Sequence, residues 1–317
     1  MTVAAILLAY AAGVGTLGAR MLARAGWTAR APLLAIVTYL AAAWSVVAAL
    51  GLAGLTLAVH GTALGGALSQ LIGACVLRLR ATYATPGGMT AAEAGLVLSA
   101  AVLVRTALVA TGHLRVAGRQ ARRHAQTARL VGLPEPTLDA VLVEHARPTA
   151  YCVAGRPPTV ILTTGALLAL DPVQLDAVLA HERAHLAWRH HRLLAMARIS
   201  RRALPFLPLM RDTEAQVERL VELHADDVAT RARDPRPLAA ALVVLAAPPG
   251  PAPLLAAGVT DAVKRIHRLL RPAEPLAGLR RQLLRALAAG LVLLPAVLAL
   301  APAVLALALG RVPSGPM

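Results

Sequence analysis

The sequence has little of several residue types, and each shortage argues against a class of protein. Among 317 residues there are two cysteines, Cys75 and Cys152, and no Cys-x-x-Cys pair, so we expect neither a disulfide framework nor a cysteine-rich metal site. One phenylalanine, four tyrosines and three tryptophans leave few aromatic platforms for stacking nucleic-acid bases. The net charge is nevertheless +16. We therefore expect an anionic membrane surface, and no direct contact with nucleic acid, to account for the basic residues.

Long hydrophobic runs, by contrast, are abundant. Hydrophobic residues make up 57% of the chain and the mean hydropathy is +0.63, whereas soluble proteins are about 45–50% apolar. A run of about 20 apolar residues crosses the ~30 Å core of a bilayer as a helix. Four runs meet that requirement: 2–19, 33–59, 94–112 and 286–310. Within the loop 60–93, we interpret the apolar segment 61–77 as interfacial or re-entrant; if it spans, everything after it changes sides.

Charge separates the chain into three parts. Residues 113–285 hold 25 of the 32 basic and 15 of the 16 acidic residues, so we expect a soluble domain there, between membrane parts at 1–112 and 286–317. Lys and Arg concentrate in cytoplasmic loops. The loop after the first span contains Arg20, Arg24 and Arg30, and the third span is followed by a further arginine cluster. This distribution predicts a cytoplasmic soluble domain and two extracytoplasmic termini.

Within the soluble domain, turn and capping signals delimit the elements. Residues 150–154 and 159–163 are short β-type runs joined by Gly155-Arg-Pro-Pro158, which predicts a hairpin. The run 160–163 is either an edge strand that pairs with substrate or part of the core. Asp171, Pro172 and Gln174 form a helix start with a capping box. That helix should reach about His190, and a second helix should run from about Asp212 to Arg233.

The first helix carries the sequence His181-Glu182-Arg183-Ala184-His185. Two His at i and i+4 share one helical face, so both rings can bind a single zinc ion. Glu182 lies about 100° around the helix, where it can act as the general base on water without being a ligand. Chance gives roughly 0.01 such matches in a chain with this many His and Glu. We therefore expect one Zn²⁺ per chain.

The second helix supplies the remaining candidates. A catalytic zinc requires a third protein ligand, and Glu222 offers a carboxylate for it; Glu218 and Glu214 are the alternatives. Asp226 is one helical turn beyond Glu222 and can orient a ligand His through a hydrogen bond. His224, between them, is either an oxyanion stabiliser or a surface residue. Three further residues are secondary candidates. Cys152 is either a fourth ligand or a buried apolar residue, and His190 and His191 are expected to be solvated or to face lipid headgroups.

Together these motifs resemble a known group of enzymes. The run Val160-Ile-Leu-Thr-Thr-Gly165, then Leu179-Ala-His-Glu-Arg-Ala-His185, then Glu222-Leu-His-Ala-Asp226 is similar to gluzincin metallopeptidases of the HtpX and CAAX-protease type. The layout of spans most resembles the BlaR/MecR antirepressor family. The resemblance implies His181, His185 and Glu222 as zinc ligands, Glu182 as general base and Asp226 as the partner of a ligand.

The resemblance also implies a fold and a function. The fold is a predominantly α-helical integral membrane protein: four transmembrane helices with an α+β zincin-like domain inserted between the third and fourth. We expect no penicillin-sensor domain after the fourth span, since the sequence ends at Met317. The implied activity is zinc-dependent cleavage of a cytoplasmic or membrane-proximal protein, such as a BlaI-type repressor in signal transduction.

The sequence is also compatible with two other functions. One is a non-catalytic signalling or scaffold protein that retains the zinc site. The other is an intramembrane site-2-type protease, which the seven charged residues between 182 and 202 disfavour, because charges facing lipid are costly.

Overall fold

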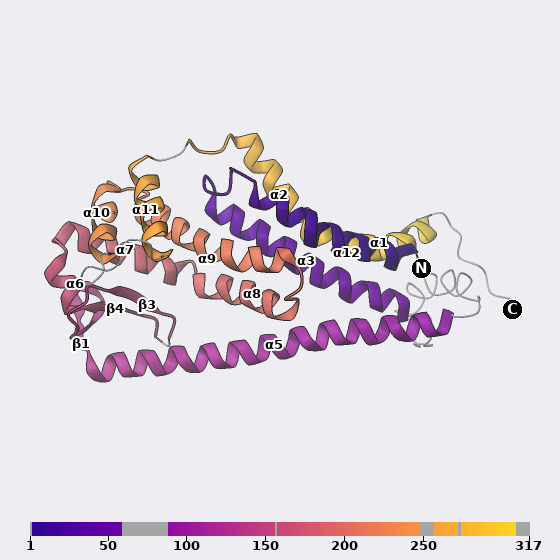
Figure 1. Cartoon of the computed structure of the whole chain (residues 1–317), viewed down its shortest axis with the longest axis horizontal. Coiled ribbons are helices and arrows are strands. Elements are labelled where there is room, and N and C mark those ends of the chain that lie inside the picture. Colours follow the sequence, from indigo (N-terminus) through magenta and orange to yellow (C-terminus); the bar gives the residue numbers. More distant parts are fainter. Residues whose placement is uncertain (1, 59–87, 156, 247–256, 272–273, 309–317) are drawn as a thin grey trace.

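The computed structural model describes residues 2–58, 88–155, 157–246, 257–271 and 274–308 (Figure 1). In these ranges the chain is mostly helical with one small mixed sheet, and the fold class expected from the sequence is confirmed. Segment 61–77 lies outside the described residues. Within the described residues, four helices are long and apolar enough to cross a membrane: Thr2–Ala23, Pro32–Leu57, Glu93–Val131 and Gly278–Ala301.

The apolar helices form a bundle around α3 (Pro32–Ala58), whose faces are rich in buried alanine and valine. Side chains this small let helix backbones approach closely in a membrane. The hydroxyl of Tyr10 donates a hydrogen bond to Ser45 Oγ of α3 at 2.8 Å. The other members of the bundle are α1 (Thr2–Gly13), a π-helical segment (Val14–Gly18), α2 (Ala19–Ala23) and α12 (Gly278–Ala308).

Helix α5 (Gly88–Val131) packs on α3 through its smallest residues. A Cβ atom added to Gly54 would lie 2.3 Å from the carbonyl oxygen of Gly95 and from Ser99 Cβ, so only glycine fits there. Ser99 Oγ donates to the carbonyl oxygen of Gly51 at 2.6 Å. Small residues and a hydroxyl between helices are typical of membrane helix pairs.

Helix α5 is also the longest of the described elements and runs from the apolar bundle to the sheet (Figure 1). Its 44 residues extend about 66 Å at 1.5 Å per residue, roughly twice the hydrocarbon thickness. We expected the third span to end at 112, yet the helix continues to Val131, because residues 113–131 contain no proline. Ala125 and Ala128, near its end, are buried against the sheet.

The sheet has the strand order β1-β2-β4-β3. The predicted hairpin is confirmed, because β3 and β4 are antiparallel with Cys152 opposite Val160. Strand β4 also pairs with β2 in parallel, so the suggestion that 160–163 is an edge strand is wrong. Strand β3 is the edge instead. The strands are β1 (Leu133–Glu135), β2 (Ala140–Val143), β3 (Ala150–Val153) and β4 (Thr159–Thr163).

Two short helices and a sharp turn follow the sheet. Helix α6 (Thr164–Ala169) begins at a Thr163 cap, and α7 (Pro172–Ala187) begins at the capping box predicted at Asp171. Helix α7 ends earlier than predicted, because Arg189 adopts a left-handed conformation with φ 51°. Helix α8 (His190–Ala203) therefore starts in a new direction. Its last carbonyl groups, of Arg202 and Ala203, accept hydrogen bonds from Arg105 of α5.

Three further helices complete the soluble domain. Helix α9 (Pro208–Ala229) begins four residues before the predicted Asp212, because Pro208 is compatible with the first helical position. It crosses α7, α8 and α3. Helices α10 (Arg236–Ala246) and α11 (Ala257–Leu270) pack against each other, and α10 also contacts α7.

Candidate metal centre

The candidate metal ligands come from two crossing helices. Helix α7 presents His181 and His185 one turn apart, and α9 presents Glu222 between them. The two Nε2 atoms are 3.1 Å apart, and each lies 3.5 Å from one oxygen of the Glu222 carboxylate. The ligand atoms of His181, His185 and Glu222 all lie within 4.8 Å of one another, and in the described part of the chain no other group of three His, Cys, Asp or Glu residues does so. Cys152 does not belong to this ligand group.

The spacing of these atoms fits a zinc ion. Tetrahedral coordination with Zn–N bonds of 2.0–2.1 Å places two ligand nitrogens roughly 3.3 Å apart. Burial lowers the pKa of His185 to about 4, so its ring is neutral and its lone pair is available. Burial raises the pKa of Glu222, but hydrogen bonding with His181 and the charge of Arg265 outweigh it and hold that pKa at about 2. Two imidazoles and one carboxylate are the ligand set of a catalytic zinc site.

Glu182 and Cys152 lie next to the ligands. Both line the same cavity as His181 and His185, and Glu182 is not part of the ligand group. Burial raises the pKa of Glu182 above its usual value, as suits a residue that must hold a proton. Burial, together with the negative charge of Glu182, raises the pKa of the Cys152 thiol to about 12. The thiol is therefore protonated in the metal-free site, and Cys152 lies outside the ligand group.

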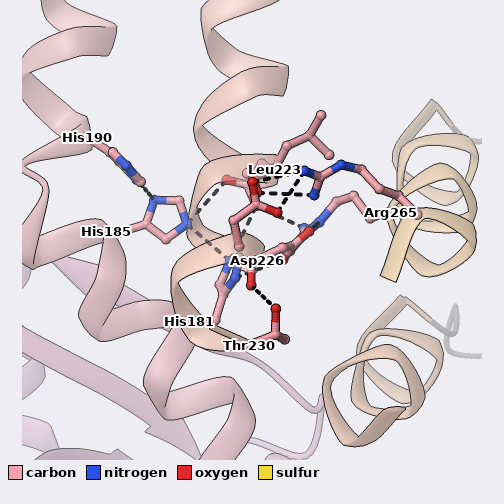
Figure 2. Close-up of polar contacts among 10 residues, drawn as sticks. His181, His185, His190, Leu223, Asp226, Thr230 and Arg265 are labelled. Atoms are coloured by element: carbon pink, nitrogen blue, oxygen red, sulfur yellow. Dashed lines mark hydrogen bonds and ion pairs between the residues drawn. The ribbon is translucent and has the colours of Figure 1, made fainter. Parts of the chain in front are cut away.

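Asp226 lies behind His181, as the sequence predicted for a partner of a ligand. Its Oδ1 is 3.0 Å from His181 Nδ1, and the residue is fully buried. Arg265 of α11 donates to both oxygens of Asp226, at 2.9 and 2.7 Å, and to Glu222 Oε2 at 2.9 Å (Figure 2). Burial raises the pKa of Asp226, but hydrogen bonds from Arg265 and His181 outweigh it and hold that pKa at about 2. No motif in the sequence indicates this role of Arg265.

The remaining histidines lie differently from what the sequence suggested. His190 is buried, with 1% of its surface exposed, so the expectation that it is solvated is wrong, whereas His191 is exposed as expected. His224 is also buried and faces His190. Its burial argues against a surface position. It does not line the cavity with the ligands, which argues against a role as oxyanion stabiliser.

The cavity over the ligands has a volume of about 380 Å³. Ala150, Tyr151 and Cys152 of the edge strand β3 form one wall. Helix α10 forms an apolar wall with Leu238, Leu242 and Leu245. The cavity therefore combines polar groups able to hold a metal, an edge strand of the described sheet and an apolar surface.

Residues 115–220 match the family model described as Peptidase family M48. The match includes the His181–His185 motif and ends two residues before Glu222. No curated protein and no solved structure matches the chain. The matched part of the chain is similar to M48 peptidases, and together with the ligand geometry this similarity indicates a zinc metallopeptidase, anchored by membrane helices, with His181, His185 and Glu222 as its zinc site. Its substrate is a protein.

Proposed function

We propose that this peptidase is an endopeptidase that cleaves an extended segment of a cytoplasmic or membrane-proximal protein. The observation that carries the proposal is that the edge strand β3 and the zinc ligands line the same cavity. An extended peptide can add to an exposed strand edge through main-chain hydrogen bonds. Such a peptide, paired with β3, passes over His181 and Glu182, and an interior peptide bond then lies at the site.

The chemistry follows from the groups in the cavity. His181, His185 and Glu222 would hold a zinc ion, which as a Lewis acid would polarise a carbonyl group and lower the pKa of water. Glu182 removes a proton from the attacking water as its oxygen bonds to the carbonyl carbon. The same carboxyl group then gives that proton to the amide nitrogen as the carbon–nitrogen bond breaks. The raised pKa of Glu182 suits this double role.

The apolar wall favours substrates with a hydrophobic side chain near the cleaved bond. Leu242 and Leu245 of α10 and Val178 of α7 line the same cavity as the ligands. Burying one apolar side chain there contributes about 1.5–3 kcal/mol to binding. A substrate with alanine in place of a large apolar residue should therefore be cleaved more slowly.

The compartment of the substrate follows from the proposed orientation. The arginines that flank the spans support a cytoplasmic position for residues 113–285 by the positive-inside rule, next to anionic lipids. A repressor of the BlaI type is the candidate that the resemblance to BlaR/MecR antirepressors suggests. An intramembrane protease is disfavoured, because α7 is not among the four candidate spans and contacts β3 and β4.

The test compares cells that produce wild-type protein with cells that produce Glu182→Gln protein. The substrate should accumulate uncleaved with the variant and should co-purify with it, because the variant binds substrate without turning it over. New termini found in wild-type cells alone should lie inside cytoplasmic sequences, beside a large apolar residue. If no protein changes in length between the two strains, a scaffold role is favoured instead. If the new termini lie in extracytoplasmic sequences, the proposed orientation is wrong.

A further inference from the structure

The zinc ligand His185 makes a contact on the side away from the metal position. Its Nε2 points toward His181 and Glu222, whereas its Nδ1 lies 2.9 Å from His190 Nδ1. His190 Nε2 in turn lies 2.9 Å from His224 Nδ1. Figure 2 shows His190 on the far side of His185 from His181. Three imidazole rings therefore form a continuous chain from the ligand group into the protein.

The fold brings these rings together by a turn and a helix crossing. The left-handed Arg189 ends α7 and lets α8 begin at His190, so that His190 turns back toward His185. His224 approaches from α9, and its ring packs at nearly a right angle against the ring of Trp188, with the ring centroids 4.7 Å apart. The three rings are thus held by three helices and one aromatic contact.

Zinc ligation at His185 Nε2 determines where every proton in this chain lies. A neutral imidazole carries one N–H. A metal on Nε2 leaves the proton of His185 on Nδ1, from which it is donated to His190 Nδ1. His190 then carries its own proton on Nε2 and donates it to His224 Nδ1. With a metal on His185 Nε2 and all three rings neutral, this is the arrangement of protons that makes both short contacts hydrogen bonds.

We propose that His190 is a positioning residue for zinc: it accepts a hydrogen bond from His185 Nδ1 and so holds the ring with Nε2 toward the metal. His224 fixes the tautomer of His190 from the other side. The inference rests on the zinc site described above and adds a role for two residues outside it. The two ligand histidines are thereby oriented in different ways, His181 by the carboxylate of Asp226 and His185 by a neutral ring.

The experiment measures zinc affinity of the full-length protein in detergent by competition with a chelator. In His190→Phe the ring shape stays but the acceptor is lost, and zinc affinity should fall about 10–100-fold, as is usual when the partner of a ligand is removed. His190→Asn keeps an acceptor at the δ position and should restore affinity to within about threefold of wild type. His191→Ala, an exposed neighbour, should bind zinc as wild type does.

Two spectroscopic measurements separate orientation from general loss of structure. The visible absorption of the cobalt-substituted protein should shift in His190→Phe and remain unchanged in His190→Asn. In zinc-loaded wild type labelled with ¹⁵N-histidine, NMR should show His190 and His224 unprotonated at Nδ1. This second measurement needs no variant, so it decides the matter if His190→Phe fails to fold.

The outcomes distinguish this inference from the zinc site itself. Wild-type zinc affinity and an unchanged cobalt spectrum in His190→Phe would overturn the positioning role alone, and so would a proton on His190 Nδ1 in the zinc-loaded protein. Failure of the wild type to bind zinc more tightly than His181→Ala would overturn the zinc site, and the positioning role with it.

Discussion

At the scale of single residues, we predict that the chemical step depends on Glu182. It lines the cavity without belonging to the ligand group. Glu182→Gln keeps the size of the side chain and removes its basic oxygen. General-base catalysis contributes about 10²–10⁴-fold, so we expect at least that loss in cleavage rate with unchanged zinc stoichiometry. Both are measured on purified protein in nanodiscs, and a variant that binds zinc and cleaves at the wild-type rate contradicts the assigned role.

The ligands and their partner should respond differently to alanine. His181→Ala, His185→Ala and Glu222→Ala should each abolish stoichiometric zinc binding, because three protein ligands leave no redundancy. Asp226→Ala should instead weaken affinity or activity about 10–100-fold, since Asp226 acts through His181. Metal analysis of purified protein checks this. If Glu222→Ala retains zinc and activity, the third ligand lies elsewhere on α9, with Glu218 as the first alternative.

Arg265 should control how the site responds to acid. Glu222 and Asp226 both have a pKa of about 2, against ordinary values of 4.5 and 3.8. Their charges therefore stabilise the fold above about pH 4, and this contribution disappears as the pH falls toward 2. Arg265→Met removes hydrogen bonds that lower both pKa values, so its acid unfolding should begin at a higher pH.

The measurement is unfolding against pH, in metal-free protein so that zinc does not mask the effect. Arg268→Met is the matched control on the same helix, because Arg268 pairs with Asp227 and does not contact the ligand group. Equal acid sensitivity of the two variants would show that Arg265 has no special role at the site.

The sequence revealed the ligands but not the residues that support them. His181 and His185 are one helical turn apart, as are Glu222 and Asp226, so helix geometry alone predicts each pair. Arg265 lies 39 residues beyond Asp226 in the chain, and nothing in the sequence distinguishes it among 31 arginines. His190 resembles its exposed neighbour His191 until the turn at Arg189 is known. Contacts made by tertiary packing have no local sequence signal.

At the scale of elements, the start of α7 was predicted better than its end. Asp171 and Pro172 specify the start of α7 through local hydrogen bonds, which are visible in the sequence. Its end depends on a positive φ at Arg189, which an arginine adopts only when the surrounding structure holds it there. Likewise, the sequence shows the apolar part of α5 but not where the polar part of the same helix stops.

The contact between α3 and α5 gives a prediction at this scale. Gly54→Ala places a methyl group 2.3 Å from the backbone of α5, which cannot shift cheaply in a packed pair. We expect a loss of roughly 1–3 kcal/mol in stability, as is usual for overpacking. Thermal unfolding in detergent measures it.

Gly112→Ala is the matched control, because nothing lies within 4 Å of a Cβ added there. Alanine favours helix over glycine by about 1 kcal/mol, so Gly112→Ala should be neutral or stabilising. If Gly54→Ala is equally well tolerated, the close approach of α3 and α5 does not occur in the membrane.

At the scale of the whole molecule, the sheet and the apolar bundle lie at opposite ends of the long axis, joined by α5 (Figure 1). Arg105 of the spanning helix α5 donates hydrogen bonds to the last carbonyl groups of α8, and so connects the two helices. A charge in a span is costly unless it is paired, and here it pairs with backbone carbonyl groups. The soluble domain is thus attached to the membrane helices along its length and not only at its ends.

Orientation is the property of the whole molecule that remains a prediction. The arginines after the first and third spans predict that residues 113–285 lie in the cytoplasm. A reporter fused after residue 130, near the end of α5, should therefore be active only as a cytoplasmic reporter, and one fused after residue 25 should behave in the same way. Extracytoplasmic activity after 130 together with cytoplasmic activity after 25 would mean that 61–77 crosses the membrane. The zinc site would then face outward, and its substrate would have to be extracytoplasmic.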